Sequence, residues 1–267
     1  MIWRFQRLGR YWKNLAIGDR FGAILTDAHG GYPDWRTEEF FETGKHDAAR
    51  FLADLERIAP TAERGRLLDF GCGVGRVTRA LAEHFESVVG MDIAPAMIAQ
   101  ARALNGAHTR CRFVVSGRAH LRRFRTGNFD VVYSRLVLQH VPPRLVRAYI
   151  REFLRVLAPG GALMFQLPDQ ICVEPQEIFV NAPVVGGRLK QRLPRNVVRT
   201  WRHLKYWLIV DEPVKQMAKA MAMFGMPHDA VLSLIREAGG CVVAVIPDQS
   251  HGPSPQGYEY WVRQASR

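Results

Sequence analysis

The sequence lacks the features that mark membrane-spanning, secreted and metal-binding proteins. None of its apolar stretches approaches the roughly 20 residues that a membrane-spanning helix needs. Its four cysteines are scattered, without the spacing of metal ligands or of a disulfide framework. The first residues contain neither the apolar region nor the small-residue cleavage site of a signal peptide. We therefore expect a cytoplasmic protein with reduced thiols and no metal site.

Two segments contain no acidic residue, and they carry most of the net charge of +12. Residues 1–18 contain four basic residues, and residues 188–205 contain seven. Together they supply 11 of the 12 charges, so the rest of the chain is nearly neutral. Segments of this kind favour anionic partners such as membrane headgroups, an anionic substrate or a nucleic-acid backbone.

Residues 1–17 are predicted to form an amphipathic helix, because apolar residues recur in alternating steps of four and three. These residues are Met1, Phe5, Leu8, Trp12 and Leu15. A basic helix of this type can lie on an anionic membrane surface. The alternative, which base rates favour, is a helix that packs on the domain with a solvated basic face. The same two interpretations apply to the basic, aromatic segment 188–208.

Residues 67–92 contain the pattern around which the chain is organised. A short apolar run ends at Phe70, glycines follow at every second position, a helical segment comes next, and a second apolar run ends in Asp92. This order predicts a nucleotide-binding βαβ unit, with Asp92 placed to accept both hydroxyls of a ribose. A tight turn needs glycine for structural reasons alone, but that reason explains neither Asp69 nor Asp92.

The glycine spacing argues against a dinucleotide. Dinucleotide sites usually show G-x-G-x-x-G, whereas Gly71, Gly73 and Gly75 form G-x-G-x-G. Asp69, just before them, would repel a pyrophosphate but suits a ligand that carries an ammonium group. In these residues the stretch resembles the first motifs of the class I S-adenosylmethionine-dependent methyltransferases.

Later motifs extend the resemblance to the small-molecule enzymes of this class. They are Phe-Asp-x-Val at 129–132, Leu-Gln-His-Val-Pro at 138–142 and Pro-Gly-Gly at 159–161. The resemblance implies an α/β, Rossmann-like, doubly wound, seven-stranded sheet, mostly parallel with a terminal antiparallel strand. It also implies N-terminal helices and a helical insertion after the fifth strand. The expected units are an N-terminal helical lid at 1–60, the cofactor-binding core at 61–167, a substrate or lid insertion at 168–226, and a C-terminal helix and β-hairpin at 227–267.

The resemblance also assigns candidate residues for S-adenosyl-L-methionine. Asp69 and the glycine-loop main chain would hold the methionine end, Asp92 the ribose, and the main chain at 134–136 would line the methyl-transfer site. Ile93 and Met97, which follow Asp92 in the chain, would lie near the adenine, although a lone methionine more often packs in the core. The expected cofactor-binding set is Asp69, Gly71, Cys72, Gly73, Gly75, Asp92, Ile93, Met97, Ser116, Gly117, Ser134 and Leu136.

The sequence departs from the family pattern after the third expected strand. The family commonly places an aspartate there to hold the adenine amino group, but Gly117 stands in its place. Adenine recognition must then rest on main chain, on Ser116 or on another group.

His140 is the candidate catalytic residue. If the acceptor is a hydroxyl, a general base with a near-neutral pKa would help, and histidine titrates in that range. The alternative is that His140 only organises its loop by hydrogen bonding. The sequence does not choose among oxygen, nitrogen and carbon acceptors.

The sequence thus predicts a methyltransferase that moves a methyl group to a small-molecule acceptor, anionic or lipid-linked, and releases S-adenosyl-L-homocysteine. One alternative is an RNA methyltransferase, suggested by the basic insertion. The Asn-Pro-Pro-aromatic signature of many nucleic-acid enzymes is absent, so nucleic acid is the weaker expectation. A second alternative, left open by Gly117, is a subunit that binds the cofactor without transferring methyl. We expect a cytoplasmic chain, peripheral at a membrane if its basic segments bind one.

Overall fold

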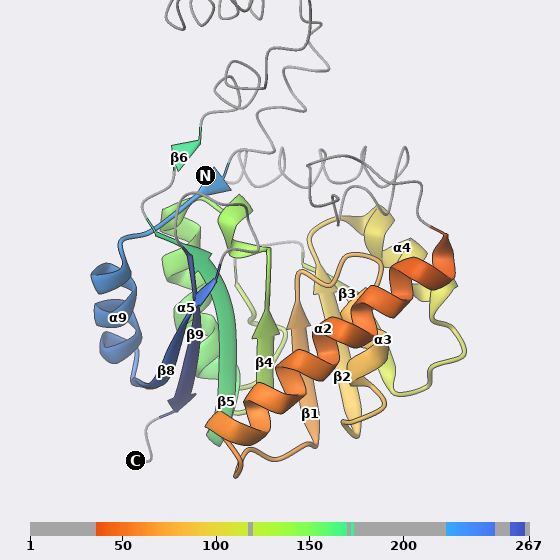
Figure 1. The fold of residues 1–267 in the computed structure, drawn as a ribbon, viewed down its shortest axis with the longest axis horizontal. Coiled ribbons are helices and arrows are strands. Elements are labelled where there is room, and N and C mark those ends of the chain that lie inside the picture. The colour runs from red at the N-terminus through yellow and green to blue at the C-terminus, as the bar shows by residue number, and fades with distance from the viewer. Residues whose placement is uncertain (1–35, 117–119, 170–171, 174–222, 249–256, 265–267) are drawn as a thin grey trace, which may run out of the picture.

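The computed structural model describes residues 36–116, 120–169, 172–173, 223–248 and 257–264. These residues form one large sheet with helices on both faces (Figure 1). The expected helix at 1–17, Gly117 and the basic segment 188–208 lie outside the described residues. No described helix is both long enough and apolar enough to cross a bilayer.

The large sheet has seven strands in the order β3-β2-β1-β4-β5-β9-β8. Strands β1 to β5 are parallel to one another, whereas β9 is antiparallel to both β5 and β8. This arrangement confirms the predicted doubly wound sheet with a terminal antiparallel strand. The strands are β1 Arg66–Phe70, β2 Ser87–Asp92, β3 Cys111–Val115, β4 Phe129–Ser134, β5 Leu157–Pro168, β8 Gly240–Asp248 and β9 Gly257–Gln264. A separate short pair joins β6 Cys172–Val173 to β7 Met223–Phe224.

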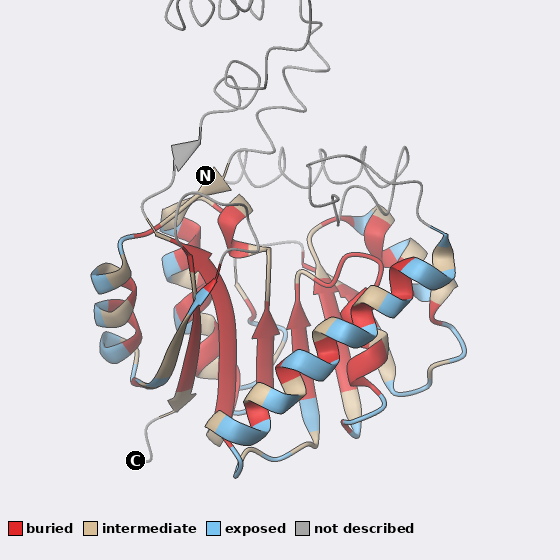
Figure 2. Cartoon of the chain, in the orientation of Figure 1, coloured by how far each residue is buried: buried red, intermediate tan, exposed pale blue. Residues whose placement is uncertain are grey.

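Helices cover both faces of the sheet and bury its apolar strands (Figure 2). α2, α3 and α4 lie on one face, and α5 and α9 lie on the other. Proline starts both α4 and α5, where its missing N–H has no intrahelical partner to lose. The helices are α2 Thr37–Ile58, α3 Arg76–Leu81, α4 Pro95–Leu104, the 3₁₀ turn η1 Leu138–His140, α5 Pro143–Val156 and α9 His228–Glu237.

Strand β5 is longer than the sequence predicts. The sequence places it at 162–167 after a Pro-Gly-Gly turn, but Leu157 already pairs with Phe129 of β4. A register shift between Phe129 and Val131 then accommodates the proline and glycines, and Gly160 has a φ of 75°. The turn residues are therefore part of an irregular strand, because the main chain keeps its hydrogen bonding by a shift in register.

The register places residues of β5 and β9 beside the carboxyl end of β4. Ser134 of β4 lies opposite Phe165 of β5, which lies opposite Tyr260 of β9. Since β1, β2, β4 and β5 run in one direction, their carboxyl ends meet at one edge of the sheet. Ligands of open α/β sheets bind outside this edge.

Candidate functional site

The glycine loop between β1 and α3 adopts a conformation that other residues avoid. Gly71, Gly73 and Gly75 have φ values of 84°, 55° and 85°. A side chain is strained in this region, so glycine is required by the backbone path. The main-chain N–H groups of Gly71 and Cys72 both donate to the carbonyl of Met91, at 2.7 and 3.0 Å. These bonds fix the loop beside the end of β2.

Asp92 ties the glycine loop to the start of α4. Its Oδ2 accepts from the N–H of Gly73 at 3.0 Å, and its Oδ1 accepts from the N–H of Ala94 at 2.8 Å. Burial raises the pKa of the Asp92 carboxyl, while these main-chain N–H groups oppose the rise. The main-chain N–H of Ile93 lowers this pKa as well, and a carboxylate has about four lone-pair positions in all. The carboxylate is thus held in one orientation with acceptor capacity left for ligand hydroxyls.

Asp69 is a buried carboxyl at the inner end of the loop. It is 3% exposed, and its Oδ2 accepts from the hydroxyl of Thr78 at 2.6 Å. Burial raises its pKa to about 6, against the lowering effects of the Thr78 hydrogen bond and the charge of Arg76. Within the described ranges it forms no ion pair. A bound cation would therefore stabilise its charged form.

The main chain after β4 is held in an unusual conformation. Leu136 has a φ of 60°, the one positive value outside glycine among the described residues. Its N–H donates to Oε1 of the buried Gln166 on β5, at 3.3 Å. Such strain costs of order 1 kcal/mol or more and concentrates at functional sites. Beside it, the hydroxyl of Ser134 is fully buried and has no hydrogen-bond partner among the described residues.

Helix α2 packs closely on the start of α3, next to the glycine loop. A Cβ at Gly44 would lie 2.4 Å from the carbonyl oxygen of Arg76, so only glycine allows this approach. Three residues later in α2, Asp47 pairs with the guanidinium of Arg76. Phe41, three residues before Gly44, lies under the guanidinium of Arg79, with 3.6 Å from Cζ to the ring centroid. This part of α2 therefore borders the loop.

Two predicted site residues have buried side chains. Met97 is 1% exposed and packs in a cluster with Phe40, Phe41 and Val74 of the glycine loop. The Cys72 side chain packs behind the loop against Phe113. The thiol of Cys72 therefore faces the core.

The segment after β3 is fixed by its own contacts. The N–H of Ser116 donates to the carbonyl of Asp92 at 2.7 Å. Its hydroxyl is hydrogen-bonded to Tyr149, a contact that lowers the pKa of this tyrosine, whereas the larger effect of burial raises it. Ile93, which follows Asp92, is partly buried. Gly117, where the family would place an acid, lies outside the described residues.

His140 ends the 3₁₀ turn η1, six residues beyond β4. Its Nε2 lies 3.2 Å from Nε2 of Gln139. η1 packs against β5 and β7, so the histidine stands at the same edge of the sheet as the glycine loop. The structure therefore brings His140 to the edge at which Ser134 and Leu136 lie.

A buried ionic network at this edge was not predicted from the sequence. Arg135 lies 3.3 Å from Glu259 of β9 and 3.3 Å from Asp47 of α2. Arg50 of α2 forms a two-pronged pair with the same Glu259. A glutamate inside the apolar strand Gly-Tyr-Glu-Tyr-Trp-Val was the sequence signal for this network.

A contact between a histidine and a tyrosine was also not predicted from the sequence. Nδ1 of His228, the first residue of α9, lies 3.0 Å from the hydroxyl of Tyr260, and the two rings are stacked. The main-chain N–H of His228 donates to Oδ1 of Asp169, the residue just after β5. Tyr260 lies two strands away from Ser134, on the order of 10 Å at the usual strand spacing.

The chain is similar in sequence to known methyltransferases. Residues 68–165 match the family model described as a methyltransferase domain. The chain is 33% identical over 166 residues to a trans-aconitate 2-methyltransferase of Streptomyces avermitilis, covering 60% of each protein. It is 32% identical over 136 residues to a 2-methyl-6-phytyl-1,4-hydroquinone methyltransferase of Synechocystis, covering 51% of this chain and 42% of that protein. The chain thus spans about half the length of these curated relatives.

Solved structures resemble the whole fold. A methyltransferase of Leishmania major superposes with a TM-score of 0.61 at 13% identity, covering 97% of this chain and 82% of the other. The magnesium protoporphyrin IX methyltransferase of Synechocystis, solved with bound S-adenosylhomocysteine, gives 0.59 at 14% identity and covers 97% and 99%. At these identities the likeness establishes the fold.

Proposed function

We propose that the chain is a class I S-adenosylmethionine-dependent methyltransferase, which transfers a methyl group from S-adenosyl-L-methionine to a small-molecule acceptor. The observation that carries this proposal is the arrangement of Asp69, the glycine loop and Asp92. One buried acid that forms no ion pair with a described residue and one oriented acid flank a loop whose three glycines carry no side chain of their own.

The residues present fit this cofactor. In the proposal Asp69 accepts hydrogen bonds from the ammonium group of the methionine part, which relieves the cost of burying its charge. Asp92 accepts the ribose hydroxyls with the acceptor capacity that its main-chain donors leave free. The Ser134 hydroxyl, which lacks a partner among the described residues, gains one. Since the Ser116 hydroxyl is already bonded to Tyr149, we propose that main chain recognises the adenine.

The cofactor supplies a sulfonium that makes its methyl group electrophilic. The residues of the chain then have two tasks, to orient the acceptor and to keep water away. The strained main chain at Leu136 and the turn η1 border the region where these tasks would be performed. Buried charge at the same edge, between Arg135 and Glu259, would keep α2 and the sheet in fixed positions.

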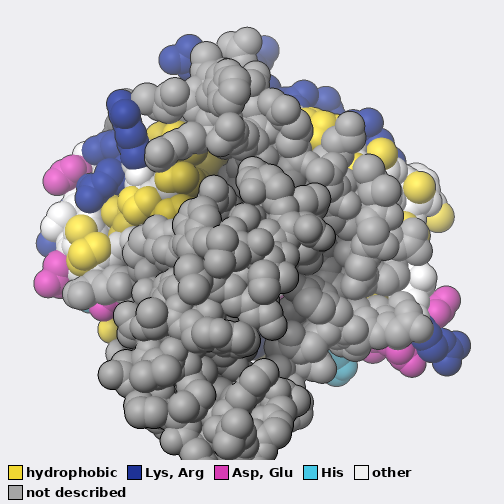
Figure 3. Space-filling view, turned by 90° about the horizontal axis from the view of Figure 1, so that it is seen from above, with side chains coloured by type: hydrophobic (Ala, Val, Ile, Leu, Met, Phe, Trp, Pro, Cys, Tyr) yellow, Lys and Arg dark blue, Asp and Glu magenta, His cyan; other side chains and the backbone are white. Residues whose placement is uncertain are grey.

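A small-molecule acceptor is favoured over RNA. The names of the two curated relatives specify trans-aconitate and a phytyl-bearing hydroquinone, and both are small molecules. At the carboxyl edge, the described surface on the side where α9 lies shows apolar side chains together with basic and acidic ones (Figure 3).

Two histidines are candidates for the general base if the methyl group is transferred to a hydroxyl. We propose His140 as the general base, and His228 as the second candidate because Tyr260 fixes its ring. Replacing each by Gln separates them. The true base, when replaced, lowers kcat and removes the acidic limb of the pH–rate profile, whereas the other variant keeps the profile.

We also propose that the basic segments 1–17 and 188–208 bring the chain to an anionic membrane surface. Liposomes with anionic lipids should then sediment the full chain, and deletion of 1–17 should reduce the sedimented fraction. If the full chain stays in the supernatant with such liposomes, this part of the proposal is wrong.

The activity itself is tested by supplying S-adenosyl-L-methionine with a labelled methyl group to the chain and a fractionated cell extract. We expect label in the small-molecule or lipid fraction and calorimetric binding of S-adenosyl-L-homocysteine. Label in RNA instead would support an RNA methyltransferase. Binding without label in any fraction would favour a non-catalytic cofactor-binding subunit.

A further inference from the structure

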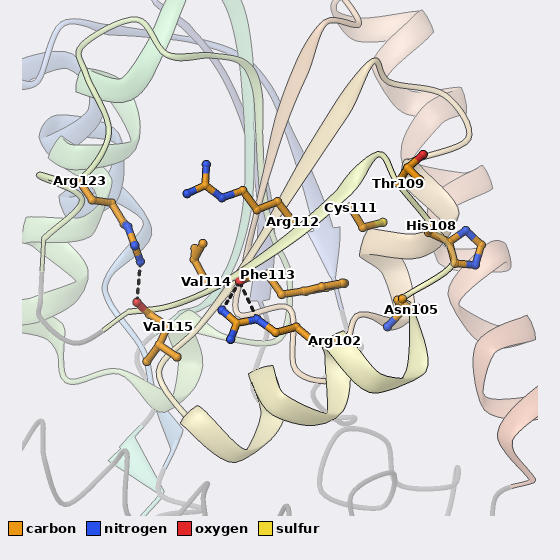
Figure 4. Close-up of a pocket in the computed structure, with 11 residues that line it drawn as sticks. Arg102, Asn105, His108, Thr109, Cys111, Arg112, Phe113, Val114, Val115 and Arg123 are labelled. Atoms are coloured by element: carbon orange, nitrogen blue, oxygen red, sulfur yellow. Dashed lines mark hydrogen bonds between the residues drawn. The ribbon is translucent and has the colours of Figure 1, made fainter.

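A groove lies along the outer side of β3, at the edge of the sheet beyond β2 (Figure 4). β3 is the edge strand of the sheet, and the end of α4 and the turn after it form the opposite wall. The groove has a volume of about 670 Å³, within the usual ~300–1,000 Å³ of small-molecule sites.

The exposed edge of β3 presents hydrogen-bond donors, because its acceptors are already occupied. The carbonyl of Phe113 accepts from Arg102 at 2.7 and 3.2 Å, and the carbonyl of Val115 accepts from Arg123 at 2.9 Å. In a strand, the N–H and C=O of one residue point to the same side. The N–H groups of Phe113 and Val115 therefore also face the groove. Another strand would need the carbonyls that the arginines cover, so the edge is poorly suited to strand pairing.

The groove is strongly basic. Arg102, Arg112 and Arg123 line it, and no Asp or Glu is among the described residues of its lining. In Figure 4 the Arg112 side chain extends from β3, the Arg102 side chain reaches the strand from α4 on its other side, and the Arg123 side chain ends near Val115. Hydrogen bonds to the main chain hold two of these guanidinium groups in place. Guanidinium groups match carboxylate and phosphate oxygens in geometry as well as in charge.

Asn105 provides a buried acceptor in the same lining. Its side chain is 2% exposed, and Nδ2 donates to the carbonyls of Val74 and Ala101 at 3.0 and 2.7 Å. Its Oδ1 is buried without a hydrogen-bond partner in the described part of the chain. A buried polar atom of this kind is rare unless a ligand or water satisfies it.

From these observations we propose that the groove beside β3 binds a small polyanion. Its phosphate or carboxylate groups contact Arg102, Arg112 and Arg123, and a hydroxyl or amine group donates to Asn105. The site is separate from the proposed cofactor site, although its floor adjoins the glycine loop: a Cβ at Gly75 would lie 2.7 Å from the Phe113 ring.

Calorimetry tests this proposal with pyrophosphate and citrate, titrated into the full chain at constant ionic strength in the presence of saturating S-adenosyl-L-homocysteine. We expect saturable binding of at least one of the two anions. The pair Arg112→Gln with Arg123→Gln should weaken this binding at least tenfold. Arg147→Gln, an exposed arginine of α5 outside the groove, removes the same type of charge and should leave the affinity unchanged.

Three results would overturn the proposal: no binding of either anion, equal weakening in the groove and Arg147 variants, or binding that S-adenosyl-L-homocysteine abolishes. The last result would place the anion at the loop instead. If loss of Arg123 unfolds the chain, Arg112→Gln alone keeps the test, because its exposed side chain bonds no described residue. A difference between pyrophosphate and citrate distinguishes a phosphate ligand from a carboxylate ligand.

Discussion

Arg135 and Glu259, 124 residues apart in the chain, meet at the carboxyl edge of the sheet, with Nε 3.3 Å from Oε1. Glu259 is 1% exposed, and its carboxylate also receives the guanidinium of Arg50 from α2. One glutamate on the last strand therefore joins the main chain after β4 to the helix that borders the glycine loop. This contact connects the C-terminal hairpin to the proposed cofactor site.

Replacing Glu259 with Gln should destabilise the fold by about 1–3 kcal/mol, because buried hydrogen-bonded charges lose their partner. Arg135 keeps Asp47 at 3.3 Å, so the loss stays below that of a fully unpaired buried charge. Chemical denaturation measures the change. Glu42→Gln is the control, since Glu42 forms an exposed pair with Lys45 on the same helix. If the two variants lose equal free energy of unfolding, the buried pair contributes no more to stability than the exposed pair.

Asp92→Ala should weaken binding of S-adenosyl-L-homocysteine by about 1–3 kcal/mol, the cost of leaving buried polar partners unpaired. The variant removes the proposed ribose acceptor and frees the N–H groups of Gly73 and Ala94. Asp130→Ala is the matched control, because Asp130 accepts from the main-chain N–H of Arg66 at the opposite end of the sheet. Calorimetry should detect weaker binding in the Asp92 variant alone. Unchanged affinity would remove Asp92 from the ribose site.

The pH dependence of binding should report on Asp69. Burial raises its pKa from 3.8 to about 6, so the folded protein holds this proton more tightly than the unfolded chain. Its stabilising contribution is therefore complete at low pH and is lost as the pH rises through about 6. The ammonium group of the ligand favours the ionised carboxylate, so affinity should rise roughly tenfold between pH 5 and pH 7.

Asp69→Asn separates these two effects. The side chain at position 69 of this variant cannot ionise, so the protein without ligand should be more stable than the wild type at pH 7. Its affinity for the ligand should be lower and should no longer rise near pH 6. Thermal unfolding and calorimetry across this pH range provide both quantities. A rise of the same size in the Asn variant would mean that another group controls the binding.

The fold and the glycine loop were predictable because local sequence specifies them. The alternation of short apolar runs with helical segments, and the residues from Asp69 to Asp92, were enough to place five parallel strands and both acids. The Arg135–Glu259 contact and the Tyr260–His228 pair were not predictable, since each depends on how β9 inserts between β5 and β8. The packing of Met97 followed the ordinary behaviour of a lone methionine in a core.

Gly71 and Gly239 offer a test of why the loop uses glycine. Both have positive φ, 84° and 82°, so alanine strains the backbone equally at each. A Cβ at Gly239 meets nothing within 4 Å, whereas a Cβ at Gly71 would lie 2.1 Å from Cγ2 of Val137. Gly239→Ala should therefore cost about 1 kcal/mol of stability, the strain alone. Gly71→Ala should cost clearly more and should also weaken binding of S-adenosyl-L-homocysteine.

The double variant Gly71→Ala with Val137→Ala isolates the clash from the strain. Removing the Val137 methyl groups opens space for the new Cβ, so the double variant should be more stable than the sum of the single changes predicts. The interaction energy from this cycle should be about 0.5–3 kcal/mol, the range for residues in contact. The same Val137→Ala change combined with Gly239→Ala should be additive, because no contact joins those positions. Additivity in both cycles would show that the loop moves away from Val137 freely. In that case the short distance between the glycine loop and the segment before η1 would not constrain the proposed cofactor site.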